Sequence, residues 1–184
     1  PADAGRELTA EIVAADSAAI QLRKLHDAQT PPLRCQITLG QAIPKGKNTD
    51  LIVQKAVEIG AAEIAPILSD RTVVRLDEEN AAAKQEKWQT VAIEAAKQCG
   101  QNWLPQVHVP QTMAQFFNER RRFDLQLIGS LQSDAVHLKK ILADYESEHG
   151  DRPRSVLMLV GPEGDFPPAE LSLARSHGCR PITL

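Results

Sequence analysis

The residues best suited to chemistry lie in the run Gly161-Pro162-Glu163-Gly164, directly after the apolar stretch SVLMLV at 155–160. Its two glycines let the backbone approach a ligand closely and expose amide groups. The run lacks the GK[ST] of a phosphate-cradling loop and does not match GxGxxG. Pro162 removes an amide donor and Glu163 would repel a phosphate, so a cationic or neutral ligand with an adenosine part is favoured. A plain strand-to-helix turn is the alternative interpretation.

The elements that position this run alternate along most of the chain. Strand-like segments are expected at 33–43, 63–68, 106–110, 123–130, 155–160 and 180–184, and helices at 49–60, 80–98, 113–122, 134–146 and 168–177. This alternation predicts an α/β fold, a mostly parallel sheet with helices on both faces. Ligands of such folds bind at the carboxyl ends of the strands, which is where residues 161–164 leave the sheet.

The N-terminal segment is of a different kind. Residues 7–13 and 17–23 alternate between polar and apolar, which predicts an antiparallel hairpin, and residues 26–33, with two prolines, predict a linker. A lone hairpin is marginal in water. We therefore expect residues 1–30 to belong to a partial β domain, and residues 33–184 to form the α/β domain.

Composition narrows the function classes. The 184 residues carry a formal charge of -3, so nucleic-acid binding would need a local basic patch. No apolar run could span a membrane and no signal peptide is apparent, so a cytoplasmic protein is expected. Three dispersed cysteines predict reduced, structural thiols. Five histidines without ligand spacing give no indication of a metal site.

Three separate blocks of the sequence resemble one family. They are LMLVGPEGDFPPAELSLARSHGCRPITL, PKGKNTDLIVQKAVEIG and KWQTVAIEAAKQCGQNWLP. The blocks are similar to the GPEGG(F/L)xxxE, PKG…QKxxE(L/I)G and WxxIAxxAxEQ(S/C)GR segments of the RsmE family, the ribosomal RNA uridine-N3 methyltransferases of the SPOUT superfamily. The resemblance covers about residues 5 to 184.

The resemblance implies a fold, a reaction and an assembly. The expected fold is a C-terminal trefoil-knot SPOUT domain after an N-terminal PUA-like β-barrel, of which residues 1–30 would be a remnant. The expected reaction transfers the methyl group of S-adenosylmethionine to N3 of a uridine in small-subunit ribosomal RNA or the 30S subunit. The family acts as a homodimer, and the chemistry needs neither a metal nor a membrane.

The resemblance also implies which residues bind the cofactor. Matching the family segments gives Ile128, Gly129, Ser130, Gly161, Pro162, Glu163, Gly164 and Leu184. Family members more often have His-Pro at the first segment and a third glycine where Asp165 stands. The arginine and glutamate of the family's last segment would follow Leu184, so Glu163 is the only catalytic candidate. We accordingly expect the sequence to represent part of a longer protein.

Contacts with RNA are expected from five residues. Lys45 and Lys47 lie on a turn after a strand, and Gln101, Asn102 and Trp103 follow the glycine that ends the long helix. The lysines suit phosphate, Asn102 suits a base edge, and Trp103 could stack on a base. A solvated loop and a packed aromatic are the competing interpretations. The run Arg120–Arg122 is interpreted as a solvated helix end.

Two other functions stay open from sequence. One is a nucleotide-binding enzyme of ordinary doubly wound type, which the missing phosphate signature disfavours. The other is a non-catalytic RNA-binding or ribosome-assembly module of the same fold, which is favoured by Gln101, where family members often have arginine.

Overall fold

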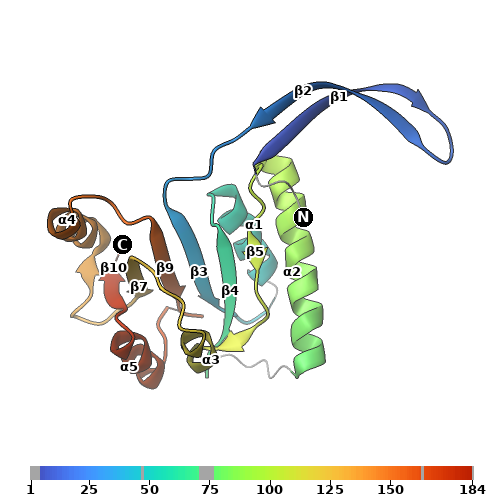
Figure 1. Cartoon of the computed structure of the whole chain (residues 1–184). Coiled ribbons are helices and arrows are strands. Elements are labelled where there is room, and N and C mark those ends of the chain that lie inside the picture. Colours follow the sequence, from blue (N-terminus) through green and yellow to red (C-terminus); the bar gives the residue numbers. More distant parts are fainter. Residues whose placement is uncertain (1–4, 47, 71–76, 163, 184) are drawn as a thin grey trace.

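A computed structural model describes residues 5–46, 48–70, 77–162 and 164–183 (Figure 1). The strands are β1 (Arg6–Ala15), β2 (Ile20–Gln29), β3 (Gln36–Ala42), β4 (Glu63–Leu68), β5 (Gln106–Val107), β6 (Gln111–Thr112), β7 (Leu125–Gly129), β8 (Val136–His137), β9 (Ser155–Val160) and β10 (Arg180–Thr183). The helices are α1 (Asn48–Glu58), α2 (Glu78–Cys99), α3 (Met113–Asn118), α4 (Leu138–His149) and α5 (Pro168–Ser176).

One eight-stranded sheet organises the α/β part of the chain. Its strand order is β5-β4-β3-β9-β7-β10-β8, with β6 paired to β4, and each of the described pairings is parallel. The apolar strand β9 lies between β3 and β7, and Leu157 and Leu159 on one of its faces are fully buried. The predicted α/β class and the parallel sheet are confirmed.

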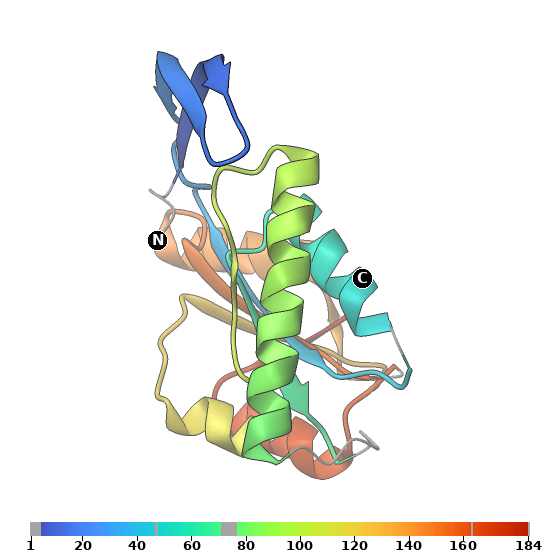
Figure 2. The ribbon, with the colours of Figure 1, turned by 90° about the vertical axis from the view of Figure 1, so that its right-hand side faces the viewer.

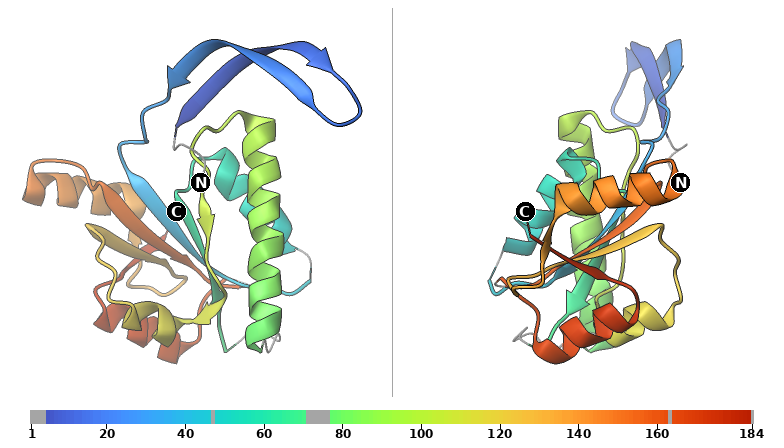
Figure 3. Two further views of the ribbon diagram at one scale, coloured as in Figure 1. Left: turned by 45° about the vertical axis from the view of Figure 1, so that its right-hand side comes forward. Right: turned by 90° about the vertical axis from the view of Figure 1, so that its left-hand side faces the viewer.

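Helices cover both faces of the sheet. On one face α1 and α2 pack around Ile64, Trp88 and Ala92, and α4 packs through Ile141 against Leu127 and Val156. On the other face α3 and α5 lie together and bury Phe116 and Leu171 against the sheet (Figure 3). Between α1 and α4 an apolar groove of about 980 Å³ remains, bordered by Leu51, Ile59 and Leu142.

Helix α2 illustrates how local sequence sets the ends of elements. Asp77 caps its start by accepting a hydrogen bond from the Asn80 amide, and Gly100 ends it in the left-handed conformation at φ 72°. The helix runs the length of the sheet, and its last turn lies toward the hairpin (Figure 2). The helix therefore returns the chain from the carboxyl ends of the strands to their amino ends.

Two predicted helices differ from those found. The helix expected at 113–122 ends at Asn118, because Glu119 caps it and Arg120 adopts a φ of 53°. Arg121 then turns inward to pair with Glu63, so the arginine run is not a solvated helix end. The helix expected at 134–146 spans Leu138–His149 instead, because residues 136–137 pair with β10 and the His137 side chain caps the helix.

The N-terminal hairpin is longer than predicted. Strands β1 and β2 form their own two-stranded sheet, and their pairing extends from Ala15↔Ile20 to Arg6↔Gln29. An Arg6–Asp27 ion pair of 2.8 Å holds the far end of the hairpin. Residues 26–29 are thus strand rather than linker, and the connection to β3 is confined to residues 30–35.

Within the described ranges, no helix is long and apolar enough to cross a membrane.

Candidate active site

Three neighbouring strands bring the expected cofactor segments to one edge of the sheet. Parallel pairing aligns Ile128 of β7 with Leu159 of β9 and with Pro181 of β10. The Ser130 amide then donates to the Ile182 carbonyl at 3.0 Å, just past the end of β7. The loop after β7 and the loop after β9 therefore leave the sheet side by side. The expected contributor after β10, Leu184, lies outside the described residues.

Ile128 differs from its neighbours in what it can offer to a ligand. Its side chain is fully buried in the core between the sheet and helices α3 and α5. Only its backbone can therefore contribute to a site. Gly129 and Ser130 follow it at the strand end, and Ser130 is also buried.

The turn after β9 folds back tightly on itself. A Cβ atom on Gly161 would lie 2.9 Å from the Asp165 carbonyl carbon and 3.0 Å from the Phe166 nitrogen, so only glycine fits this position. Gly164 has a φ of 112°, which side-chain-bearing residues rarely adopt. Pro162 is half-buried between them, and Glu163 lies outside the described residues. The two glycines thus allow a tight strand-to-helix turn, in which Gly161 is buried and Gly164 is exposed.

Asp165 joins the two loops. One of its carboxylate oxygens accepts the Leu131 amide at 3.3 Å and the Gln132 side-chain amide at 3.1 Å. The other accepts the Phe166 amide at 3.0 Å. Sequence reasoning treated Asp165 only as a departure from the usual glycine and missed this role. The sequence did contain a signal for this role, because Asp165 lies two residues before a proline pair. Aspartate side chains often accept hydrogen bonds in such turns.

Two more polar side chains support the turn from beneath and beside it. Gln41, at the end of β3, donates to the Ala42 carbonyl at 2.8 Å, with the Gly161 carbonyl 3.5 Å away. Glu170, in the first turn of α5, accepts from the Ser69 hydroxyl at 2.7 Å and from the Asp70 amide at 2.9 Å. Glu170 is only 8% exposed and links the loop after β4 to α5.

Neither Gln41 nor Glu170 was singled out from the sequence. Glu170 is the closing glutamate of the GPEGG(F/L)xxxE pattern, so the motif itself carried the signal. Gln41 has no comparable signal, because its partner is 119 residues away in sequence.

A hollow of about 310 Å³ lies beside the two loops. Its walls come from both loops and from α5, and they include Gln132, Asp134, Asp165 and Phe166. Arg175 of α5 pairs with Asp134 at 2.8 Å on its rim. Small-molecule sites begin at about this volume. Because Arg175 balances Asp134, Asp165 leaves the lining with a net negative charge, which suits a neutral or cationic ligand better than a phosphate.

A family model described as an RNA methyltransferase domain matches residues 31–184. The chain belongs to the RsmE family of RNA methyltransferases. Among its relatives is the ribosomal RNA small subunit methyltransferase E of Synechocystis, 31% identical over 80% of this chain and 46% of the relative. The Bacillus subtilis protein of the same name is 29% identical over 76% of this chain and 54% of its own length. The chain thus spans about half the length of these curated relatives.

Two solved structures of the same fold contain S-adenosylmethionine. A Legionella pneumophila protein solved with this bound cofactor is 29% identical, with a TM-score of 0.82 over 100% of this chain and 72% of that one. The ribosomal RNA small subunit methyltransferase E of Neisseria gonorrhoeae is 28% identical, with a TM-score of 0.80 over 98% and 71% of the two chains. The likeness therefore extends over the whole described sheet, including the edge that carries the two loops.

The RNA-contact residues expected from the RsmE resemblance lie at two different edges of the sheet. Lys45 is exposed after β3, at the same carboxyl edge as the two loops, and Lys47 lies outside the described residues. Gln101, Asn102 and Trp103 follow α2 at the opposite edge. The structure therefore does not bring the two groups together within one chain.

Residues 102 and 103 hold the hairpin against the α/β part of the molecule. The Asn102 side-chain amide donates to the Thr30 hydroxyl at 2.8 Å and to Glu7 at 3.1 Å. The Trp103 indole donates to the Thr30 carbonyl at 2.9 Å. These polar groups have structural partners in the hairpin and its connection to β3, and the Trp103 side chain is half-buried. In the part of the chain that the structure describes, no cluster of His, Cys, Asp or Glu could hold a metal ion.

Proposed function

We propose that this chain belongs to an S-adenosylmethionine-dependent methyltransferase that modifies N3 of a uridine in small-subunit ribosomal RNA. The observation that carries the proposal is the glycine turn after β9, which is joined through Asp165 to the loop after β7. The same fold, in relatives of nearly 30% identity, is seen with the methyl donor bound.

The residues present fit this cofactor. Gly161, Pro162 and Gly164 offer backbone that can lie against an adenosine group, together with Ile128, Gly129 and Ser130 on the adjoining loop. Glu163 and Asp165 supply negative charge that suits a sulfonium, and Leu184 stays a proposed contributor. The cofactor, when bound, supplies a methyl group on a positively charged sulfur.

The remaining requirement is an activated uridine. A neutral imide nitrogen is a poor nucleophile, so its proton must leave or its developing anion must be stabilised as N3 attacks in line with the carbon–sulfur bond. Lys45, exposed at the same edge, is suited to holding a phosphate of the substrate or a negative charge near the base. Glu163 stays the candidate for proton transfer.

The proposal includes an architecture. The separate β1–β2 sheet supports the assignment of residues 1–30 to a PUA-like barrel, and residues 33–184 are proposed to form the SPOUT domain with its trefoil knot. A homodimer is also proposed. The exposed apolar side chains Leu51, at 55%, and Ile59, at 83%, support it, since faces of this kind mark protein contacts. The proposed ribosomal RNA substrate supports a cytoplasmic location, which we also propose.

Calorimetric titration of the gene product with S-adenosylmethionine and with NAD tests the cofactor. We expect binding of the first alone. Gly161→Ala should abolish that binding because the added methyl group forces the turn open. Gly100→Ala is the matched control, since its strained φ of 72° costs about 1 kcal/mol at the far edge without any clash. Equal S-adenosylmethionine affinity in both variants would contradict the assigned site.

Incubation with labelled methyl donor and small ribosomal subunits tests the reaction. We expect the label at N3 of a uridine, and its loss in Gly161→Ala and Glu163→Ala. A gene product that binds subunits and methyl donor but transfers no label would show that the enzyme proposal is wrong.

A further inference from the structure

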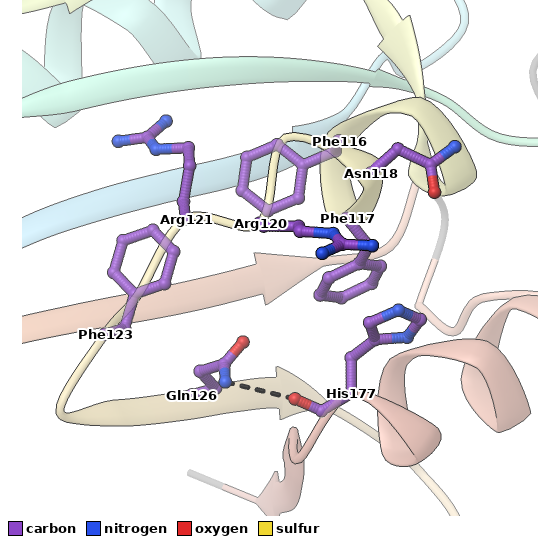
Figure 4. Close-up of a pocket in the computed structure, with 8 residues that line it drawn as sticks. All are labelled: Phe116, Phe117, Asn118, Arg120, Arg121, Phe123, Gln126 and His177. Atoms are coloured by element: carbon purple, nitrogen blue, oxygen red, sulfur yellow. Dashed lines mark hydrogen bonds between the residues drawn. The ribbon is translucent and has the colours of Figure 1, made fainter.

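Another pocket lies at the end of the sheet away from the two cofactor loops, where the strands begin. It is formed between α3, the start of β7 and the end of α5. We call it the α3–β7 pocket, and its volume is about 330 Å³. Figure 4 shows its lining: Phe116, Phe117, Asn118, Arg120, Arg121, Phe123, Gln126 and His177. Gln126 closes its floor by donating to the His177 carbonyl at 3.0 Å. Along β7, roughly 10 Å separates Gln126 from Gly129 at the cofactor edge.

Arg120 is held in the pocket by an unusual backbone. Its φ of 53° makes it the only non-glycine residue at positive φ in the described ranges. Glycine is the favoured residue at this position after a helix, and side-chain-bearing residues held there store strain. Within those ranges the Arg120 guanidinium makes no hydrogen bond or ion pair, and the side chain is exposed. It extends toward Phe117 and His177 (Figure 4). An arginine here gives up backbone stability for a charge in the pocket.

Arg121 is fixed where Arg120 is not. It pairs with Glu63 and lies 5.8 Å from the Phe116 ring centre and 5.3 Å from that of Phe123. These contacts fix the Arg121 guanidinium in the wall of the pocket, whereas the Arg120 guanidinium can contact a ligand. Glu63 balances the charge of Arg121, so the pocket has a rigid wall on that side and a cationic arm in Arg120.

The remaining wall offers a flat aromatic surface. His177 stacks on Phe117, with ring centres 4.3 Å apart and an interplanar angle of 15°. Phe117 is buried while His177 is exposed, so the imidazole has one face on the core and the other toward solvent. Exposed flat rings of this kind stack on unpaired bases. The Asn118 side chain beside it, also exposed, can hydrogen-bond a base edge.

These features select the class of ligand. Arg120 carries the guanidinium of this lining that is not paired with a carboxylate among the described residues, and its uncompensated charge favours an anion. The ring surface beside them favours a planar group. A phosphate linked to a base combines both.

We propose that the α3–β7 pocket binds an unpaired nucleotide of the RNA substrate, with the phosphate on Arg120 and the base on His177. This inference rests on the proposed function for the identity of the RNA. It adds a contact at the edge of the sheet away from the cofactor, so the substrate would lie across the α3 and α5 face.

Fluorescence anisotropy with a short labelled oligouridine tests the pocket. Arg120→Gly and Arg120→Gln should each weaken binding about tenfold, as expected for one charge-assisted contact. Losing one phosphate contact should also make the dependence of log affinity on log salt shallower by about 0.7. Arg122→Gln removes the same charge from an exposed residue outside the pocket and should leave both quantities unchanged.

Arg120→Gly separates binding from folding. Because glycine relieves the strained φ, its melting temperature should equal or exceed that of the parent protein while RNA binding falls. His177→Ala should weaken RNA binding severalfold, whereas His177→Phe, which keeps the flat surface, should retain it.

Several results would overturn the pocket assignment. One is an RNA affinity in Arg120→Gly equal to that of the parent protein, and another is a loss of RNA affinity in Arg122→Gln as large as that in Arg120→Gly. The others are no binding of the oligouridine by the parent protein, and binding of uridine monophosphate as tight as that of the oligouridine. Calorimetry with S-adenosylmethionine reports separately on the proposed function. Arg120-dependent RNA binding without cofactor binding would sustain the pocket and refute the methyltransferase proposal.

Discussion

At the scale of single residues, the candidate site depends on side chains that hold loops rather than on side chains that face a ligand. Asp165 and Glu170 each accept two or more hydrogen bonds from a different part of the chain. The glycine turn could be recognised from spacing alone, because Gly161 and Gly164 meet a local backbone requirement. The supporting role of Asp165 could not, because its partners are more than thirty residues away in sequence.

Replacing Asp165 by alanine should separate the two loops. Unsatisfied amides and lost charge-assisted bonds predict a destabilisation of about 2 kcal/mol and a loss of S-adenosylmethionine affinity of at least tenfold. Urea unfolding and calorimetry measure the two effects. Asp134→Ala, which removes a carboxylate on the rim of the same hollow, is the control, and an equal loss of affinity there would argue against a special role for Asp165.

The cysteines should differ sharply in reactivity. Burial raises the pKa of Cys179 to about 12, and burial also raises the pKa of the half-buried Cys35. Cys99 is exposed. Since the thiolate is the reactive form, a thiol reagent at pH 8 should modify Cys99 first and leave Cys179 unmodified until the protein is denatured. Peptide mass mapping measures the order, and early labelling of Cys179 would contradict its burial.

At the scale of elements, the sequence predicted which segments are helices and strands better than it predicted where they end. β4 and β9 have the predicted bounds, since apolar runs bounded by polar residues define them. The end of α3 could not be predicted, because it depends on Arg121 pairing with Glu63, 58 residues away. The extension of β2 likewise depends on backbone pairing with β1, which reaches Arg6 and Gln29.

The junction of the hairpin gives an element-scale prediction. Trp103→Phe removes the donor to the Thr30 carbonyl but keeps an aromatic ring, so trypsin should cleave the hairpin faster at Arg23 and Lys24. Gln101→Ala is the control, because the junction's side-chain hydrogen bonds among the described residues come from Asn102 and Trp103. If trypsin cleaves the Trp103→Phe variant at the parental rate but the variant loses RNA affinity, the base-stacking interpretation of Trp103 is the correct one.

At the scale of the whole molecule, parallel pairing could be predicted but the order of strands could not. Alternation of strand and helix indicates the sheet type, whereas the placement of β9 between β3 and β7 follows from packing between distant segments. For the same reason, the sequence did not predict that Lys45 lies at one end of the strands and that Gln101, Asn102 and Trp103 lie at the other.

Acid stability provides a prediction at this scale. The hydrogen bond from His108, followed by that from Arg121, holds the pKa of Glu63 below its ordinary 4.5. A lowered carboxyl pKa contributes stability that is present above the unfolded value and is lost as pH falls through the folded value. The free energy of unfolding should therefore decline as pH falls below about 4.5. This decline should be smaller in Glu63→Gln than in the parent protein. Glu86→Gln, on an exposed part of α2, should follow the parental curve.

The central pairing of β3 with β9 has a consequence for how the protein is made. Gln41 and the carbonyl of Val160 meet although 119 residues separate them, so the middle of the sheet closes only after β9 has been synthesised. Closing so long a loop is entropically costly and slow. During translation the face of β3 and β4 that packs against α5 stays exposed until β9 and α5 emerge from the ribosome, and apolar surface exposed at that stage favours aggregation.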